Sequence, residues 1–323
     1  MKILVCPLNW GLGHATRCIP LIRQWVEDEH EVVIVADGHP LALLRDVFPE
    51  LRTIRFSSYR ISYSPGKSQV VAMLKSLPNI VYGIFREHLW LTKLLEKEHF
   101  DRVVSDNRFG MWSRRVESVY ITHQLRVKMP RPFRWLEPLN VLLHRFLINR
   151  YTQCWIPDYE GPENLSGELS HGLKLPSHCL FIGPLSRFQG FREAETTTEN
   201  YDWVMIISGP EPQRTLFEAA MTAKALEGAA KTLLVRGLPG SNEPQQQQGN
   251  LTIVNHLADV ALASALIHCN HIFCRSGYST LMDLHTLGCL HKAVLIPTPG
   301  QTEQEYLAGY HQKKTAEVSS RGC

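Results

Sequence analysis

A histidine in a glycine-bearing turn is the first residue of this chain that could do chemistry. His14 lies in GLGHATR, after Gly11 and Gly13 and before a predicted helix. Glycines let a ligand approach the backbone, and an imidazole titrates near neutral pH, so His14 could take a proton from a bound hydroxyl. A histidine that only caps the helix is the alternative. Because His14 follows a strand end, where open α/β sheets bind ligands, we favour a functional role.

Two turns in the second half of the chain are suited to phosphate. Ser208-Gly209 follows the apolar run WVMII, and Arg275-Ser276-Gly277 follows HIFC, with a helix expected to begin near Ser279. Free N–H groups and the dipole at a helix N-terminus favour anions, so the two sites would suit two linked phosphates. Any protein with alternating strands and helices has several such turns, so each turn alone is a weak signal.

Charged and amide residues near these turns could complete a ligand site. Arg187 follows a Gly-Pro turn and could neutralise a departing diphosphate, or could be a solvated surface arginine. Asp283 is expected in a first helical turn, where it could contact a ribose or only complement the helix dipole. Gln301, Gln304 and Glu305 begin the last predicted helix and could bind sugar hydroxyls, or could be ordinary helix-start residues.

Asp106 is a candidate in the first half of the chain. It ends the predicted strand 101–107. Its carboxylate could act as a second base or contact an acceptor, although an aspartate at a strand end is often only a cap.

The elements that would position these residues alternate along the chain. Apolar runs predict strands at 2–8, 31–38, 51–56, 101–107, 119–124, 153–158, 203–208, 232–237, 251–257, 271–274 and 293–297. Helical patterns lie between most of them, and 238–250 is predicted to be an exposed polar loop. This alternation predicts two doubly wound, Rossmann-like α/β domains that face each other across a cleft. We expect domains at 1–158 and 201–323, with 159–200 as the region between them.

Composition narrows the class of protein. The chain has 323 residues, 44% hydrophobic and 20% charged, with a net charge of +3, which gives no indication of nucleic-acid binding. Its eight cysteines are scattered without CxxC pairs, which favours reduced thiols and no zinc site. The opening MKILVCPLNWG is too short for a signal peptide, and no apolar run could span a bilayer. We therefore expect a cytoplasmic protein, with membrane association left open.

The segment 126–150 is basic and apolar at once. It carries six arginines or lysines among Phe133, Trp135 and many leucines, with Glu137 as its one acid. Such a segment could rest on an anionic bilayer and serve a lipid-linked acceptor. The plainer interpretation is a core helix with a basic flank, and it has our slight preference.

The chain resembles the two-domain GT-B glycosyltransferases in four segments taken together. These segments are GLGHATR, IGPLSR, IISGPEPQR and CRSGYSTLMDLHTLGCLHKAVLIPTPGQTEQEY. The resemblance is closest to glycosyltransferase family 28, which includes the MurG-type N-acetylglucosaminyltransferase of peptidoglycan synthesis, and is strongest over 251–308. It indicates a relative in cell-envelope polysaccharide synthesis rather than that enzyme itself. It also makes the first domain the acceptor side and the second the nucleotide-sugar side.

The resemblance implies roles for individual residues. Arg275-Ser276-Gly277 matches the family's Arg-Ser-Gly turn, Ser208 and Arg187 match its diphosphate contacts, and Asp283 matches its ribose contact. The uracil of the donor would lie near Val254 and Leu257. The donor sugar would contact a pair that is Gln-Gln in the family and Gln304-Glu305 here, so the identity of the donor sugar is left open. His14 matches the histidine of the family's first loop, and Thr122-His123-Gln124 loosely resembles an acceptor-side motif.

The implied activity is metal-independent, inverting transfer of a sugar from a UDP-sugar to a hydroxyl acceptor, expected to be a glycan or a lipid-linked acceptor. The chain has no Asp-x-Asp motif, which agrees with the absence of a metal cofactor. His14, or failing that Asp106, would be the base. The GxGHxxR form of the first loop also resembles nucleotide-sugar hydrolases, in which water replaces the acceptor. A nucleotide-sugar-binding protein without catalysis is a further alternative.

Overall fold

The computed structural model describes residues 1–57, 69–191 and 200–321. The chain divides into two compact units, one formed by Met1–Asn9 with His14–Leu185 and the other by Trp10–Gly13 with Ser186–Cys323. The division after Leu185 falls inside the predicted boundary region 159–200, of which 192–199 lie outside the described residues.

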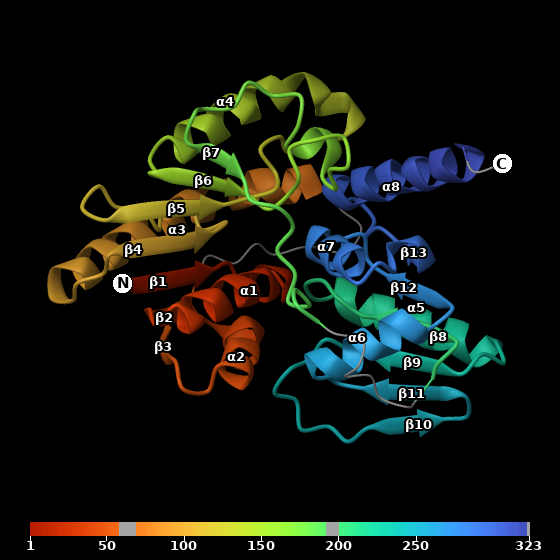
Figure 1. Cartoon of the computed structure of the whole chain (residues 1–323). Helices are drawn as coiled ribbons and strands as arrows, with labels where there is room; N and C mark the ends of the chain where they lie inside the picture. The colour runs from red at the N-terminus through yellow and green to blue at the C-terminus, as the bar shows by residue number, and fades with distance from the viewer. Residues whose placement is uncertain (58–68, 192–199, 322–323) are drawn as a thin grey trace. The chain divides into compact units, whose positions relative to one another are not determined.

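The first unit is built on a parallel sheet of seven strands (Figure 1). The order β3-β2-β1-β4-β5-β6-β7 places β1 at the point where the winding reverses. Its strands are β1 Lys2–Pro7, β2 Glu31–Ala36, β3 Arg52–Arg55, β4 Arg102–Asp106, β5 Glu117–Ile121, β6 Gln153–Ile156 and β7 Cys179–Phe181. Its helices are α1 Gly13–Glu27, α2 Gly38–Val47, α3 Gln69–Lys97, the 3-10 helix η1 Arg131–Leu136, α4 Glu137–Ile148 and the 3-10 turn η2 Gly167–Leu169.

The second unit has a six-stranded sheet in the order β10-β11-β9-β8-β12-β13, parallel apart from β10. Its strands are β8 Trp203–Ile206, β9 Thr232–Val235, β10 Gln246–Gln248, β11 Leu251–Val254, β12 His271–Cys274 and β13 Ala293–Leu295. Its helices are α5 Gln213–Glu227, α6 Asp259–His268, α7 Tyr278–Thr286, the 3-10 turn η4 Leu290–Lys292 and α8 Thr302–Arg321.

Apolar cores on both faces explain why the central strands are almost continuously apolar. In the second unit, Met205 of β8 packs with Phe217 of α5 on one face, while Val204 packs with Leu262 of α6 on the other. In the first unit, Leu4 of β1 packs with Leu91 of α3. Helices on both faces of a parallel sheet are the doubly wound arrangement, so the predicted fold class is confirmed for each unit.

Four details differ from the sequence predictions. Strand β7 adds a seventh strand after the last one predicted in the first half. The loop predicted at 238–250 contains the edge strand β10, whose glutamines are exposed but pair with β11. Helix α7 begins at Tyr278, so Asp283 is not in its first turn. The preferred interpretation of 126–150 as a core helix with a basic flank is wrong, because Leu139 and Leu142 of α4 are each 62% exposed.

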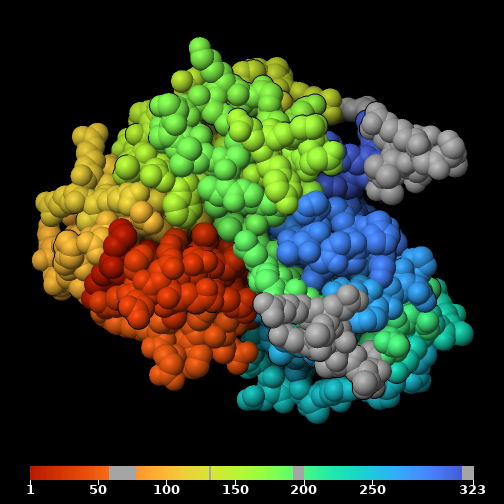
Figure 2. Space-filling model, in the orientation of Figure 1, coloured from red at the N-terminus to blue at the C-terminus, as the bar shows by residue number. Residues whose placement is uncertain are grey.

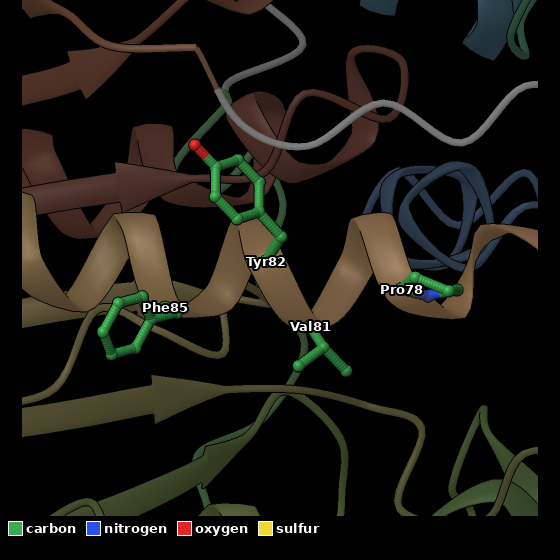
Figure 3. Close-up of a pocket in the computed structure, with 4 residues that line it drawn as sticks. All are labelled: Pro78, Val81, Tyr82 and Phe85. Atoms are coloured by element: carbon green, nitrogen blue, oxygen red, sulfur yellow. The ribbon is translucent and has the colours of Figure 1, made fainter.

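A shallow hollow lies on α3 and is lined by Pro78, Val81, Tyr82 and Phe85. Figure 3 shows Tyr82 projecting from one side of the helix and Val81 and Phe85 from the other. The side chains of Val81, Tyr82 and Phe85 are between 59% and 67% exposed. Among the described helices, none is both long and apolar enough to cross a membrane.

Candidate active site

The first loop of the chain brings His14 to the end of the first sheet. Strand β1 ends at Pro7, Gly11 takes a positive φ of 80°, and α1 begins at Gly13, so His14 is the second residue of the helix. A residue with a side chain would be strained at Gly11, which explains the glycine there. Pro7 is the register partner of Asp106 on β4, so the aspartate ends its strand beside the start of α1.

His14 and Asp106 form a hydrogen-bonded pair. His14 Nδ1 lies 2.7 Å from Asp106 Oδ1. The carboxylate is fully buried, whereas the His14 side chain keeps 12% of its surface exposed. The two side-chain polar contacts of His14 with other described residues, to Asp106 and to Arg17 Nη2, both involve Nδ1, which leaves Nε2 for a substrate. This is the geometry of a general base with an aspartate that orients it.

Arg17 and His123 complete the cluster, and sequence reasoning gave Arg17 no role. Arg17 donates to both carboxylate oxygens of Asp106 in a forked arrangement, and its Nη1 lies 3.0 Å from His123 Nδ1. Arg17 is only 1% exposed, so its charge is balanced inside the protein. The signal for it in the sequence was the spacing of three residues from His14, which puts both on one face of α1.

The charges of the cluster determine its protonation. Burial alone would raise the pKa of Asp106, but Arg17 and His14 outweigh burial and lower that pKa to about 2. Asp106 therefore only accepts hydrogen bonds at neutral pH, and when it accepts one from His14 the proton is on Nδ1, so Arg17 Nη2, 2.9 Å from Nδ1, makes no hydrogen bond to it. Burial lowers the pKa of His14 below its usual value, opposed by the attraction of Asp106. His14 is then neutral at pH 7, with the lone pair on Nε2.

The second unit places several of the predicted ligand residues at one edge of its sheet. Ser208 and Gly209 follow β8, Val254 ends β11 with Leu257 shortly after, and Arg275 follows β12. Strand β9 pairs in parallel with both β8 and β11, and β8 pairs in parallel with β12. The carboxyl ends of these strands therefore lie at the same edge of the sheet. Gly209 has a φ of 109°, which only glycine adopts freely, so the turn after β8 depends on it.

Arg187 and Asp283 meet at this edge in a buried ion-pair cluster. Ser186 Oγ donates to Asp283 Oδ1 at 2.6 Å, and Arg187 Nε lies 3.5 Å from Asp283 Oδ2. Arg187 Nη1 also lies 3.4 Å from Asp259 at the start of α6. With 11% of its side chain exposed, Arg187 is not a solvated surface arginine. Burial raises the pKa of Asp283 to about 6, although Arg187 opposes the shift.

The turn Arg275-Ser276-Gly277 is tied to the loop after β13. The Cζ atom of Arg275 lies 3.9 Å from the centre of the Phe217 ring, and Arg275 Nη1 donates to the carbonyl of Pro297 at 2.9 Å. Ser276 Oγ donates to the carbonyl of Gln304 at 2.7 Å. Arg275 is 5% exposed and Ser276 is fully buried. The Arg275 side chain therefore positions the loop after β13, the Ser276 side chain positions the first turn of α8, and Gly277 is the N-cap residue before α7.

The predicted sugar-binding residues hold the same loop. Gln304 Oε1 accepts from the N–H of Thr298 at 2.8 Å, and Glu305 Oε1 accepts from the N–H of Gly300 at 2.9 Å. Gln301, like Gln304, is partly exposed, and Ser279 is partly exposed in the first turn of α7. Among the described residues, no cluster of histidine, cysteine, aspartate or glutamate could hold a metal ion.

Comparisons with known proteins support a single class. No protein-family model matches the chain. One uncharacterized glycosyltransferase of Methanosarcina acetivorans is 29% identical over 248 residues, covering 71% of this chain and 60% of the relative. A second from the same organism is 24% identical, covering 94% of this chain and 82% of the relative. The chain thus spans three-fifths of the first relative's length and about four-fifths of the second's.

Solved structures share the fold. The glycotransferase of kitacinnamycin has a TM-score of 0.57 at 14% identity, covering 95% of this chain and 83% of its own. The spinosyn rhamnosyltransferase SpnG, complexed with thymidine diphosphate, has a TM-score of 0.56 at 14% identity, covering 99% and 91%. Arabidopsis thaliana UGT89C1, complexed with UDP-L-rhamnose, has a TM-score of 0.52 at 11% identity, covering 99% and 93%. The solved structures show that the fold is GT-B, as predicted, and the sequence relatives are named glycosyltransferases.

Proposed function

We propose that the chain is an inverting, metal-independent glycosyltransferase, a relative of family 28, that moves a sugar from a UDP-sugar to a hydroxyl of a lipid-linked acceptor. The observation that carries the proposal is the His14–Asp106 pair, in which His14 Nδ1 lies 2.7 Å from Asp106 Oδ1 and Nε2 is left for a substrate. An orienting carboxylate behind a neutral imidazole is what proton abstraction from a hydroxyl requires.

The proposed reaction has one chemical step. Nε2 of His14 takes the proton of the acceptor hydroxyl while that oxygen attacks C1 of the donor sugar. The bond from C1 to the diphosphate oxygen breaks, its electron pair leaves with UDP, and attack from the opposite face inverts C1. The imidazolium that forms is stabilised by Asp106, which is ionised throughout because its pKa is about 2.

The second unit would hold the donor at the carboxyl edge of its sheet. N–H groups of the turns after β8 and β12 would stabilise the charge that grows on the departing diphosphate. Asp283 would accept hydrogen bonds from the ribose, held in place by Ser186 and Arg187. Gln304 and Glu305 would shape the sugar pocket through the loop they hold.

The lipid-linked acceptor is supported by the surface of the first unit. Val81, Tyr82 and Phe85 of α3 are exposed on the same unit that carries the proposed base. Val81 and Phe85 project from the same side of α3, and neighbouring exposed apolar side chains are suited to binding an apolar ligand.

A panel of nucleotide sugars tests the proposal in two stages. Thermal shift identifies the donor, since a bound ligand raises the melting temperature. UDP release is then measured in EDTA with and without a membrane lipid extract. The proposal expects release that depends on the extract and yields a glycosylated lipid. Equal release of UDP and free sugar without extract would reassign the chain to the hydrolases, and binding without release would reassign it to the non-catalytic proteins.

A further inference from the structure

Two cysteines lie next to each other on adjacent strands of the first unit. Cys154 of β6 and Cys179 of β7 are register partners, and the two strands run parallel. Side chains at partner positions of neighbouring parallel strands point to the same face of the sheet, so the two thiols are neighbours. They share a hydrogen bond. Both cysteines are free, so the pair is a dithiol in this structure.

The pair is covered on its face and open at the edge of the sheet. Both cysteines pack in the core cluster that contains Ile148 of α4, and Figure 1 shows α4 running over β6 and β7. Strand β7 is the outermost strand at its end of the sheet. Figure 2 shows the green part of the chain, which includes β7, at the surface of the first unit. Cys154 is fully buried whereas Cys179 is partly exposed, so a small molecule can reach Cys179 first.

Cys179 also differs in acidity from other cysteines of the chain. Its hydrogen bond with Cys154 lowers the pKa of Cys179, and the positive charge of Arg145 on α4 lowers it further, against the effect of burial. In the apolar core of the second unit, burial raises the pKa of Cys269 to about 11 and that of Cys289 to about 12. The thiolate is the nucleophilic form of cysteine, so Cys179 should react faster than these buried thiols.

We propose that Cys154 and Cys179 form a reversible disulfide, in which a peroxide oxidises Cys179 first and Cys154 then resolves the product. The Cys179 thiolate attacks one oxygen of hydrogen peroxide. The S–O bond forms as the O–O bond breaks, and the departing hydroxide takes up a proton to become water. The Cys154 sulfur then attacks the Cys179 sulfur, the S–O bond breaks, and a second water leaves with the Cys154 proton. Two electrons thus pass from the dithiol to the peroxide.

The strand geometry permits this bond and makes it easy to reduce. Neighbouring strands lie about 4.8 Å apart, which is within the range of about 4.4–6.8 Å between the Cα atoms of disulfide-bonded cysteines. The Cβ atoms of a parallel pair are about as far apart as the strands, beyond the ~3.8 Å of a relaxed disulfide, so the bond would be strained. Strained disulfides are reduced more readily, as a reversible bond requires. The inference concerns the two thiols and does not rest on the proposed transfer reaction.

Peroxide treatment of the folded full chain, followed by alkylation of the remaining thiols and trypsin digestion without reductant, tests the proposal. The trypsin peptides 151–174 and 175–187 each contain one of the two cysteines. They should become linked into one species, lighter by two hydrogen atoms than the sum of the two, and dithiothreitol should separate them. Before oxidation, iodoacetamide should alkylate Cys179 of the folded protein at least tenfold faster than Cys269 or Cys289.

Single variants separate the roles of the two thiols. Cys154→Ala should leave Cys179 as a sulfenic acid that dimedone labels, because the resolving thiol is gone, and Cys179→Ala should lose both the link and the label. Cys269→Ala removes a buried thiol from the second unit and should form the link at the unchanged rate. Circular dichroism should show all three variants folded. The unchanged protein needs no variant to refute the proposal, since the absence of the linked peptides, or a link from Cys179 to a different cysteine, would overturn it.

Discussion

Replacing Asp106 by asparagine removes the carboxylate that orients His14 and leaves His14, the proposed base, in place. The change keeps the shape of the side chain but leaves Arg17, at 1% exposure, without its buried counter-charge. The fall of the Asp106 pKa from 3.8 to about 2 corresponds to about 2 kcal/mol of stability, which is complete above pH ~4 and is lost as the pH falls through ~2. Removing one partner of a buried ion pair costs more, about 3 kcal/mol.

The same substitution should slow turnover without weakening donor binding. An asparagine can present its NH2 group to Nδ1, which would favour the tautomer with the proton on Nε2 and remove the base. We expect kcat for UDP release to fall by about 10²- to 10⁴-fold, the usual contribution of general base catalysis, with the KM for donor unchanged. Urea unfolding at pH 7 gives the stability loss on the same sample.

A double variant tests whether Asp106 acts through His14 or independently of it. If Asp106 acts through His14, then His14→Ala and His14→Ala with Asp106→Asn should have the same kcat, because residues that act as one unit are non-additive. Multiplied effects, or an Asp106→Asn enzyme that is folded and fully active, would refute the reasoning. Asp101→Asn is a suitable control, because Asp101 is a partly exposed acid that precedes the same strand.

Three other predictions concern protonation and the donor site. Because burial lowers the pKa of His14, kcat at saturating donor should fall with acid only below pH 6.5, and a midpoint above that would contradict a neutral buried base. Because the pKa of Asp283 is about 6, calorimetric donor affinity should weaken as the pH drops through ~6, and Asp283→Asn should remove that dependence. Gln304→Ala leaves the N–H of Thr298 without its acceptor and should raise donor KM about fivefold, at about 1 kcal/mol, while the exposed Gln312→Ala should not.

Sequence patterns predicted the strands because buried parallel strands are apolar throughout, and they located the turns because glycine and serine follow strand ends. They also singled out His14 and Asp106 separately. Their pairing depends on the register between β1 and β4, which matches Pro7 with Asp106 and is not written in local sequence. For the same reason the forked contact of Arg17 was missed.

Helix α4 shows a second limit of sequence reasoning. Its apolar residues recur at a helical period, which indicates that they share a face but not what the face meets. Preference for a core position follows from the usual burial of leucine, yet His144 and Ile148 are the residues that face inward. Gln304 and Glu305 show the same limit. The sequence predicted that their side chains bind sugar hydroxyls, whereas in the structure these side chains hold the loop from Thr298 to Gly300.

Single-turnover transfer by His14→Ala tests the central claim most directly. With the donor identified by thermal shift, lipid extract as acceptor and EDTA present, the unchanged protein should release UDP and form a product of inverted anomeric configuration. His14→Ala should bind the donor with the same dissociation constant and transfer at least about 10²-fold more slowly. Transfer by His14→Ala at the unchanged rate would contradict the account.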